Sequence, residues 1–504
     1  MTLLESETWA QPVRLTGFDS EGESFRSGAR ILRGIYPGHA ARVRRVLEVC
    51  AANDLFSNGI IGTSELASNP YPELRYEMVL EHERVEFITY PHEWSASMFK
   101  DAALFHVDLF ERLSSHGLTL KDWHPYNVLF RGTSPVFVDF TSIVPIGSLE
   151  NEAHLSINRP ARGFDRMWDG TARAIYEMYS TMFEPFFALP LEMMHRGRHA
   201  NARHRLAETA LNTSRIAITR KEAFEGSPIA RLLYEVGDRS LRTALTEKGP
   251  DKKRFFDAVR RHVEKLHVAV TGSAYSSYYE DKGEAFSREP QPEWTNKQRA
   301  VDDALTRFAP GSVLDLGSNA GWFSMLAATH GCSVVAVDLD EASIDRLYST
   351  ALRDGLSVLP LVVNLASPKP ERFALTFENE PSLSAIGSEE PVISSPVKRL
   401  RSDMTLALAI VHHLALGQGM TFEQIANLFD ALSRDHVCVE FVDMDDRMIT
   451  GEPEFFPAYN AARNSFGWYT RENFISALEA HFGSVEVLPS HPETRSMLVC
   501  SRLA

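Results

Sequence analysis

The sequence predicts an α/β protein with a C-terminal doubly wound, Rossmann-like sheet, preceded by an α+β region with a helical extension. From about residue 295 onward, short apolar runs alternate with helical patterns, as in a parallel sheet covered by helices on both faces. A glycine turn follows the first of these runs. Residues 165–270 carry helical patterns with few strand signals, which predicts the helical extension. A chain of 504 residues has room for roughly two to four domains.

Five buried strands are expected in the C-terminal part. They are the runs SVLDLG, SVVAVDLD, VLPLVVN, TLALAIV and HVCVEFV, which begin at Ser312, Ser333, Val358, Thr405 and His436. Residues 366–401 lie between the third and fourth runs, are dense in Pro, Ser and Glu, and predict a flexible surface loop. Residues 272–294 are rich in Gly, Ser, Pro and charge, so we expect a linker there and a C-terminal domain at 295–504.

The part before the linker divides into two expected pieces. Residues 1–90 alternate short apolar runs with polar turns, which is typical of a small mixed lobe. Residues 91–271 begin with a helical pattern from Ser95 to a C-cap at Gly117 and continue into the helical extension.

Composition limits the kind of function. The net charge of −15 would repel a nucleic-acid backbone, so a small-molecule partner is favoured over nucleic acid. The four cysteines form no CxxC pair, so neither a zinc site nor a disulfide framework is expected, and no metal site is assigned. No apolar run reaches the ~18 residues of a membrane span. We therefore expect a cytoplasmic protein without a membrane partner; its oligomeric state is left open.

The stretch VLDLGSNAGWF has the form of a nucleotide-cofactor turn. It places Asp315 at a strand end, Gly317 and Gly321 in the turn, and a helix directly after them. Seventeen residues after Gly321 comes Asp338, again at a strand end, where a carboxylate can accept both hydroxyls of a ribose. The form Asp-x-Gly-x-Asn-x-Gly favours S-adenosylmethionine over a dinucleotide; a Rossmann-like sheet without a cofactor is the alternative.

This combination resembles the seven-stranded class I methyltransferases. The resemblance implies that Asp315, Gly317, Asn319 and Gly321 line the methionyl side of S-adenosylmethionine and that Asp338 holds its ribose. The third strand ends at Asn364, where these enzymes often carry an acidic residue beside the adenine. The neighbouring residues Ser318, Leu339 and Leu365 complete the expected cofactor contacts.

Candidates for the methyl-transfer step follow the fourth and fifth strands. His412 and His413 end the fourth strand, and imidazole is a suitable base near neutral pH for a hydroxyl acceptor. Alternatively, one or both histidines only pack or hydrogen-bond beneath the cofactor. Glu440 and Asp443, at the tip of the next strand, rank second. The aromatic residues between 455 and 468 form either an acceptor lid or the core of the closing helix.

A second motif lies in LKDWHPYNVLFRGTSPVFVDF. Asp122, then Asn127 and then Asp139 have the spacing that supplies a base and two magnesium ligands in protein and aminoglycoside kinases, so residues 91–271 resemble a kinase C-lobe. However, no lysine occurs before Lys100, so the strand lysine of kinases is missing, although Arg30 or Arg33 is a possible substitute. We expect a kinase-like domain without robust kinase activity that helps to bind the methyl acceptor. The three polar residues could instead only brace their loop.

The likeness extends over nearly the whole chain. The stretches PHEWSASMFKDAAL, LKDWHPYNVLF, DLGSNAGWFS, LALAIVHHLAL and FFPAY resemble a bacterial family of SAM-dependent methyltransferases that includes nodulation-associated proteins. The resemblance implies methylation of an oxygen or nitrogen of a small molecule, in a biosynthetic or glycan-modifying pathway. The alternatives are a bifunctional kinase and methyltransferase, or a cofactor-binding regulatory protein without catalysis.

Overall fold

The computed structural model describes most of the chain. The described residues are 9–15, 21–146, 175–176, 178–209, 218–246, 251–270, 272–273, 286–364, 386, 394–451 and 456–502. Among them, no helix is both long and apolar enough to cross a membrane.

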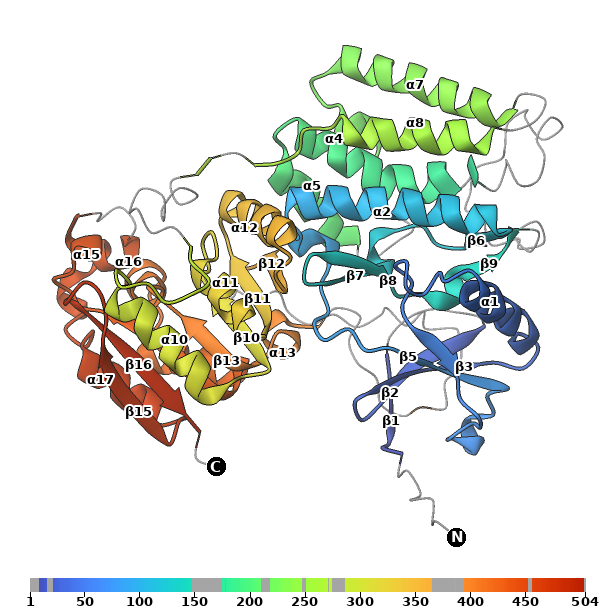
Figure 1. The fold of residues 1–504 in the computed structure, drawn as a ribbon. Coiled ribbons are helices and arrows are strands. Elements are labelled where there is room, and N and C mark those ends of the chain that lie inside the picture. Colours follow the sequence, from blue (N-terminus) through green and yellow to red (C-terminus); the bar gives the residue numbers. More distant parts are fainter. Residues whose placement is uncertain are drawn as a thin grey trace, which may run out of the picture.

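An antiparallel sheet of five strands opens the fold (Figure 1). Its order is β1 (Pro12–Arg14), β2 (Gly22–Ser27), β3 (Arg30–Ile35), β5 (Met78–His82) and β4 (Thr63–Glu65). Helix α1 (Ala40–Ala52) connects β3 to β4 and buries Val43 and Val46 in the same apolar cluster as Ile35 and Leu80. Phe25 and Leu32 pack on Tyr71 and Tyr76 in a separate cluster, so the sheet is covered on two sides.

Helices dominate the next part of the chain. The long helix α2 (Ala96–Ser115) begins at Ser95, whose side chain accepts the N–H of Met98 as an N-cap. Two short antiparallel sheets of two strands follow: β6 (Leu118–Leu120) pairs with β9 (Ile143–Pro145), and β7 (Val128–Arg131) pairs with β8 (Ser134–Phe137). The remaining helical segments are η7 (Tyr179–Ala188), α4 (Leu189–His195), α5 (His199–Thr209), α6 (Arg220–Ala223), α7 (Pro228–Thr246) and α8 (Lys252–Glu264). The predicted helical extension is therefore present in the described residues.

The C-terminal region contains a seven-stranded sheet. Its order is β12 (Val358–Val362), β11 (Ser333–Asp338), β10 (Ser312–Leu316), β13 (Ser402–Ala407), β14 (Ser433–Val442), β16 (Arg495–Ser501) and β15 (Ser484–Pro489). Neighbouring strands are parallel from β12 to β14, and β16 is antiparallel to β14. The first five of these strands correspond to the five that the sequence predicts, so the α/β class and the Rossmann-like sheet are confirmed. The end of the fourth was predicted wrongly, because β13 stops at Ala407 and the chain turns at Ala409 before it reaches His412 and His413.

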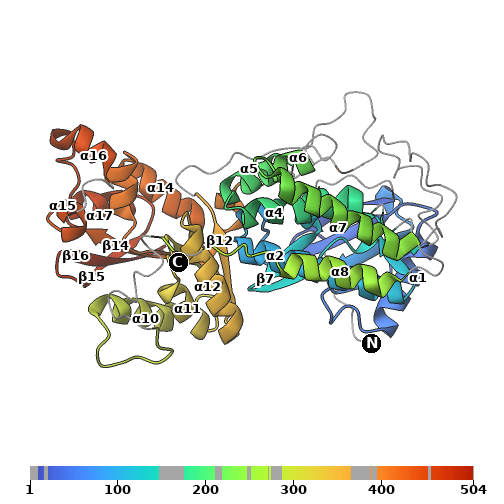
Figure 2. The same cartoon turned by 90° about the horizontal axis from the view of Figure 1, so that it is seen from above.

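Helices cover both faces of this sheet (Figure 2). One face carries α10 (Asn296–Phe308), α11 (Trp322–Thr329) and α12 (Glu341–Asp354), and the other carries α14 (Phe422–Leu432) and α17 (Arg471–Glu479). Ligands of such sheets bind beyond the carboxyl ends of the parallel strands, where the strand order reverses on either side of β10. That edge therefore holds the site.

Helix α12 joins the C-terminal sheet to the N-terminal region. The Asp345 carboxylate accepts the backbone N–H and the hydroxyl of Ser97, both at 2.9 Å, at the start of α2. These bonds satisfy a donor that the first turn of a helix leaves without an intrahelical partner. One turn further along α12, the Tyr348 hydroxyl donates to Asp101 at 2.8 Å. Arg203 on α5 forms an ion pair with Glu341 at the first residue of α12.

A second connection lies at the end of the segment 366–401, where the sequence predicts a flexible loop. Most of that segment lies outside the described residues, but α13 (Pro396–Arg399) near its end packs firmly on the N-terminal region. Arg399 pairs with Glu93, and their side chains are only 4 and 6% exposed. Arg399 also donates to the Ile88 carbonyl at 2.6 Å. The described end of the segment thus contributes a buried ion pair, which composition alone does not reveal.

Candidate functional site

The turn between β10 and α11 requires glycine at two positions. Gly317 and Gly321 have φ values of +65° and +79°, in the left-handed region that favours glycine. A Cβ atom on Gly321 would lie 2.3 Å from Leu347 Cδ1, and one on Gly317 would lie 2.9 Å from Ile410 Cδ1. The N–H groups of Gly317 and Ser318 both donate to the Val337 carbonyl, at 2.9 and 3.1 Å. The turn is therefore held tightly against β11.

Asp315 lies buried beneath this turn. The Ser324 hydroxyl, on the first part of α11, donates to its carboxylate at 2.6 Å. Burial raises the pKa of Asp315 to about 6, and the hydrogen bond from Ser324 partly opposes that rise. The carboxylate is thus charged at neutral pH but close to its titration range. Sequence analysis did not identify Ser324, because its role depends on a contact across the turn.

Asp338 connects the turn to the next strand. Its carboxylate accepts the N–H of Asn319 at 2.8 Å and the N–H of Asp340 at 2.9 Å. Burial raises the pKa of Asp338, and these backbone donors lower it in part. Asn319 itself has a φ of +52°, so the backbone of the turn bends toward Asp338. The two strand ends that the sequence assigns to the cofactor therefore meet at one edge.

The other expected cofactor residues lie along the same edge or beside it. Leu339 follows Asp338 directly and is 57% exposed. Asn364 is also exposed and lies at the end of the next strand, where the Val363 N–H donates to the Asp338 carbonyl. The Ser318 hydroxyl is buried and has no hydrogen-bond partner in the described part of the chain, which marks it as a group that a ligand could satisfy. Leu365 lies outside the described residues.

His412 and His413 follow β13 on the opposite side of the turn. The chain turns at Ala409, with a φ of +53°, and the next residue, Ile410, lies over Gly317. The centroids of the two imidazole rings are 4.3 Å apart, and both rings pack against Phe456, with centroid distances of 5.7 Å for His412 and 5.5 Å for His413. His412 is fully buried, and neither ring nitrogen has a hydrogen-bond partner among the described residues. His413 is only partly buried.

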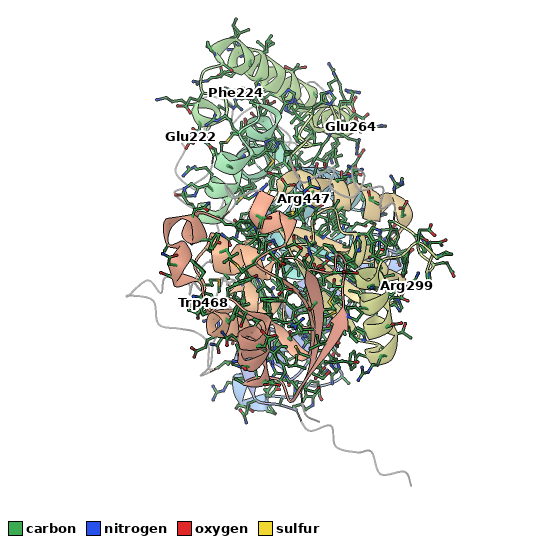
Figure 3. The ribbon with its side chains drawn as sticks, turned by 90° about the vertical axis from the view of Figure 1, so that its left-hand side faces the viewer. Glu222, Phe224, Glu264, Arg299, Arg447 and Trp468 are labelled. Atoms are coloured by element: carbon green, nitrogen blue, oxygen red, sulfur yellow. The ribbon has the colours of Figure 1, made fainter. Side chains whose placement is uncertain are left out.

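The surroundings keep both histidines neutral. Burial, with a smaller effect of His413, holds the pKa of His412 well below its usual value, and burial also lowers the pKa of His413. A neutral imidazole can accept a proton, and His413 is the better placed of the two because part of it reaches solvent. The aromatic residues Tyr459, Phe466 and Trp468 lie beyond Phe456, and Figure 3 views the side of the C-terminal region that carries Trp468 and Arg447.

Glu440 occupies a different environment from the one expected for an acceptor ligand. Its side chain is fully buried and accepts the Lys297 ammonium at 2.8 Å and the Ser490 hydroxyl at 2.6 Å. The Arg495 guanidinium lies 3.7 Å away and also donates to Asp446. Burial opposes ionisation of Asp446, yet the hydrogen bonds from Arg495 and Thr494 lower its pKa to about 2. Glu440 is thus part of a paired network of buried charges.

Lys297 is the residue at this edge that sequence analysis missed. It comes from α10, whose start is fixed by a capping box of Thr295 and Gln298. Its ammonium group lies 5.3 Å from the centre of the Phe323 ring, in addition to its bond with Glu440. Its positive charge also lowers the pKa of Asp315 as a minor contribution. A lone lysine upstream of the first strand belongs to no motif, so only the fold brings it here.

The second motif is brought together in the N-terminal region. Asp139 lies 3.2 Å from the Arg33 guanidinium on β3 and also accepts the Thr141 hydroxyl at 3.3 Å. The N–H of Asp122 donates to the Ser142 hydroxyl at 2.9 Å, and the Val138 N–H donates to the Asn127 carbonyl at 2.9 Å. The three residues therefore lie on the segments that connect the two short sheets. The side-chain amide nitrogen of Asn127 is buried without a hydrogen-bond partner among the described residues.

The two arginines that could replace the missing lysine form different contacts in the structure. Arg33 approaches Asp139, whereas Arg30, on the same strand, forms a two-pronged pair with Glu81, with both bonds at 2.6 Å. Their offset of three residues on β3 places the two side chains on opposite faces of the sheet, because successive side chains of a strand alternate. The sequence alone does not show which of the two faces meets Asp139.

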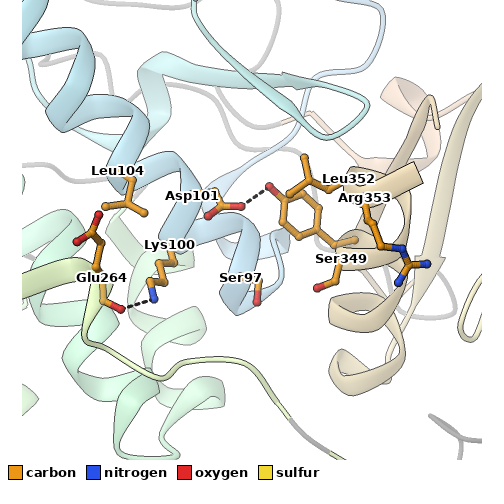
Figure 4. A pocket seen from close by; sticks show the side chains of 9 residues that line it. Ser97, Lys100, Asp101, Leu104, Glu264, Ser349, Leu352 and Arg353 are labelled. Carbon is orange, nitrogen blue, oxygen red and sulfur yellow. Dashed lines mark hydrogen bonds between the residues drawn. The ribbon is translucent and has the colours of Figure 1, made fainter. Parts of the chain in front are cut away.

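A cavity of about 460 Å³ lies between the two regions, apart from both motifs (Figure 4). It is lined by Ser97, Lys100, Asp101, Leu104, Glu264, Tyr348, Ser349, Leu352 and Arg353. Lys100 donates to the carbonyls of Glu264 and Leu266, and Asp101 accepts the hydroxyl of Tyr348. Its main polar groups are thus occupied by bonds that hold the regions together.

Comparisons with known proteins find similarity at low sequence identity. No protein-family profile matches the chain. Over 395 residues it is 25% identical to nodulation protein NoeA of Rhizobium meliloti strain 1021, covering 76% of this chain and 75% of NoeA. The chain is thus similar to NoeA at a low level of identity.

Solved methyltransferases are also similar. Magnesium protoporphyrin IX methyltransferase from Synechocystis PCC 6803, with bound S-adenosylhomocysteine, matches 45% of this chain and 96% of its own, with 14% identity and a TM-score of 0.29. The bifunctional kinase-methyltransferase WbdD matches 47% of this chain and 45% of its own, with 15% identity and a TM-score of 0.28. The S-adenosylhomocysteine in the Synechocystis structure is what S-adenosylmethionine, the cofactor expected from the sequence, becomes when it loses its methyl group. At these values the solved structures say nothing about the substrate.

Alanine at Gly321 should damage the turn more than alanine at a matched glycine. Gly321→Ala adds a clash with Leu347 to the strain of a positive φ, whereas Gly331, with a φ of +83°, has nothing within 4 Å of an added Cβ. The strain costs about 1–2 kcal/mol at either site, and overpacking costs roughly 1–3 kcal/mol more at Gly321 alone. Urea unfolding of both variants measures the difference, and equal losses would show that the turn tolerates a side chain.

Cofactor affinity should depend on pH through Asp315. Below its pKa of about 6 the carboxyl group is neutral and no longer attracts a positively charged ligand. We therefore expect the affinity for S-adenosylmethionine to fall by up to about tenfold per pH unit below that value. Ser324→Ala removes a bond that favours the charged form, so the fall should begin at a higher pH. Calorimetric titrations from about pH 5 to 8 test this, and an unchanged midpoint in the variant would contradict it.

Raising the pH should lower the stability of the cofactor-free protein, whereas it should raise the affinity for the cofactor. The folded pKa of Asp315 lies above the unfolded value of about 3.9, so the folded state binds more protons between these two values. The contribution of Asp315 to the free energy of unfolding therefore decreases as the pH rises from about 4 to about 6. Denaturant unfolding without cofactor across this range gives the sign directly.

Proposed function

We propose that the chain is a methyltransferase that uses S-adenosylmethionine to methylate an oxygen or nitrogen of a small molecule or glycan-pathway metabolite. The observation that carries this proposal is the bond from the Asn319 N–H to the Asp338 carboxylate. It joins the glycine turn after β10 to the acidic end of β11, which is the arrangement that holds an adenosine cofactor at a sheet edge. The alignment with NoeA over three quarters of both chains supports a shared overall organisation.

The residues at this edge support the chemistry of methyl transfer. When bound, S-adenosylmethionine supplies a methyl group on a positively charged sulfur. Asp315 and the glycine turn would hold its methionyl part, and Asp338 its ribose. His413 is neutral and partly open to solvent, so it can remove the proton from an acceptor hydroxyl or amine as the new bond to the methyl carbon forms. Glu440 ranks lower as a catalytic group, because Lys297, Ser490 and Arg495 already surround its carboxylate.

Binding of the cofactor tests the first part of the proposal. We expect S-adenosylmethionine and S-adenosylhomocysteine to bind the purified protein in a calorimetric titration. Asp338→Ala should weaken both by at least about tenfold, because a carboxylate with two hydrogen bonds to a ribose is lost. Asp354→Ala, at the exposed far end of α12, is the matched control and should bind as the parent protein does. The proposal fails if neither ligand binds.

Transfer of a labelled methyl group to a panel of small-molecule acceptors tests the second part. His413→Ala should lower turnover by roughly 10²–10⁴ while leaving cofactor affinity nearly unchanged, because a general base acts on the acceptor. His330→Ala serves as the control, since His330 only pairs with Asp302 at the distant end of α11. Tight cofactor binding with no transfer to any acceptor would favour a regulatory protein without catalysis.

For the N-terminal region we propose a kinase-like domain, with a small lobe at residues 1–90 and the remainder at 91–271, that helps to bind the methyl acceptor. The five-stranded sheet with a single helix after β3 supports this proposal, as does the position of Asp122, Asn127 and Asp139 on the connections between the two short antiparallel sheets. In kinases, residues at these positions hold the attacking hydroxyl and two magnesium ions.

One contact favours a second candidate function, a bifunctional kinase and methyltransferase. Kinases place a lysine on the third strand of the small lobe, near the aspartate that binds magnesium. Here Arg33 lies on β3 within 3.2 Å of Asp139, so a cation stands at that position although the first 99 residues contain no lysine. Arginine binds phosphate as a planar fork, so its geometry differs from that of lysine.

Phosphoryl transfer from ATP with magnesium, measured with the same acceptors, separates the two candidates. If the domain is a kinase, Asp122→Ala and Asp139→Ala should abolish transfer, and Arg33→Met should lower it by at least about a hundredfold. Arg30→Met is the matched control, because this neighbouring arginine pairs with Glu81 instead. The absence of any acceptor-dependent transfer would leave the acceptor-binding role.

A further inference from the structure

Helix α7 carries an apolar stripe on the side that faces solvent. The side chains of Ile229, Leu232, Leu233 and Val236 are 75, 59, 66 and 54% exposed. Their spacing of three, four and seven residues from Ile229 places all four on one face of the helix. We call these four residues the α7 stripe. It contains half of the eight most exposed large apolar side chains in the described residues, so exposure of this kind is concentrated there.

The fold does not need the α7 stripe for its own core. The opposite face of the helix supplies that contact, because Ala244 and Leu245 are buried and Tyr234 and Leu241 pack against the main cluster. Helix α7 lies at the outer edge of the molecule with α8 beside it, as Figures 1 and 2 show from two directions. The stripe therefore points away from the protein along a convex edge.

The charge around the stripe is opposite in sign to that of the whole chain. Residues 228–265 contain ten lysines and arginines but six aspartates and glutamates, whereas the chain as a whole has 52 basic and 67 acidic residues. Three cations are exposed and form no ion pair within the described residues: Arg239 on α7, Arg261 on α8, and Lys265, which directly follows α8. The α7 stripe is thus accompanied by cations that are available to an external partner.

This charge distribution indicates which kind of partner could cover the α7 stripe. A second copy of the chain, docked through the same edge, would bring the same excess of positive charge against itself. An anionic surface would instead complement it, and a flat one suits a convex helical edge. We propose that the α7–α8 edge binds an anionic lipid surface, with the α7 stripe at the boundary of headgroups and acyl chains and the cations near headgroup phosphates.

This proposal is independent of the methyltransferase function and extends the view from the sequence. The expectation of no membrane partner rested on the lack of an apolar run long enough to span a bilayer. A helix that lies in the interface needs only one apolar face and flanking cations, and neither requires a long apolar run.

Sedimentation of the full-length protein with vesicles tests the proposal. We expect binding to phosphatidylcholine vesicles that contain about 30% phosphatidylglycerol, weaker binding at high salt, and little binding to phosphatidylcholine alone. The double variant Leu232→Glu and Leu233→Glu should reduce binding at least tenfold. Val487→Glu is the control, because Val487 is 48% exposed on the edge strand β15, far from this helix in the sequence and in the fold.

A matched charge variant and a folding check complete the design. Arg261→Glu combined with Lys265→Glu should also reduce binding while leaving the α7 stripe intact. Unchanged circular dichroism and unchanged S-adenosylmethionine affinity, measured on all variants, exclude a folding defect as the cause of lost binding. Equal sedimentation of the parent and the Leu232→Glu and Leu233→Glu variant, or no sedimentation of the parent, would overturn the proposal. Self-association that this variant abolishes, in the absence of vesicle binding, would instead identify a second copy as the occupant.

Discussion

The arrangement of the whole molecule depends on the contact between Asp345 and the start of α2. Helix α12 begins immediately after the strand that ends at Asp338, and its carboxylate at Asp345 satisfies two donors of Ser97 in the other region. The same helix therefore follows a cofactor residue and caps a helix of the N-terminal region. Because Asp345 is buried, loss of its partners would leave a buried charge without hydrogen-bond donors. This energetic cost opposes separation of the two regions.

Buried charges at the carboxyl edge of the sheet are mostly paired, and this pairing shapes the site. The charge of Lys297 offsets that of Glu440, and the charge of Arg495 offsets that of Asp446. His412 and His413 contribute no charge at neutral pH, because burial lowers their pKa values. Asp315 differs from these groups, since its hydrogen-bond donors belong to Ser324, a neutral residue, and burial raises its pKa. A positively charged ligand beside Asp315 would supply the compensation that the protein itself gives the other acids.

The parts of the fold that could be predicted from the sequence are those with a local cause. Five strands followed from short apolar runs, and the turn at Gly317 and Gly321 followed from glycine spacing, which the positive φ values explain. The contacts that remained hidden join residues far apart in the chain. Lys297 meets Glu440 across 143 residues, Arg33 meets Asp139 across 106, and Arg399 meets Glu93 across 306. No periodicity or spacing encodes such pairs, so only the three-dimensional structure could identify them.

The pair of Arg399 and Glu93 has a consequence for how such a chain can change during evolution. Arg399 belongs to a connection between two strands of the C-terminal sheet, yet its side chain is buried against Glu93 of the N-terminal region. A recombination event at residues 272–294 would separate both Arg399 and Asp345 from the groups that compensate them. Exchange of either half with that of a distant relative would thus leave both of these buried charged groups without their partners. The two halves are expected to be inherited as one unit, with their contact residues varying in concert.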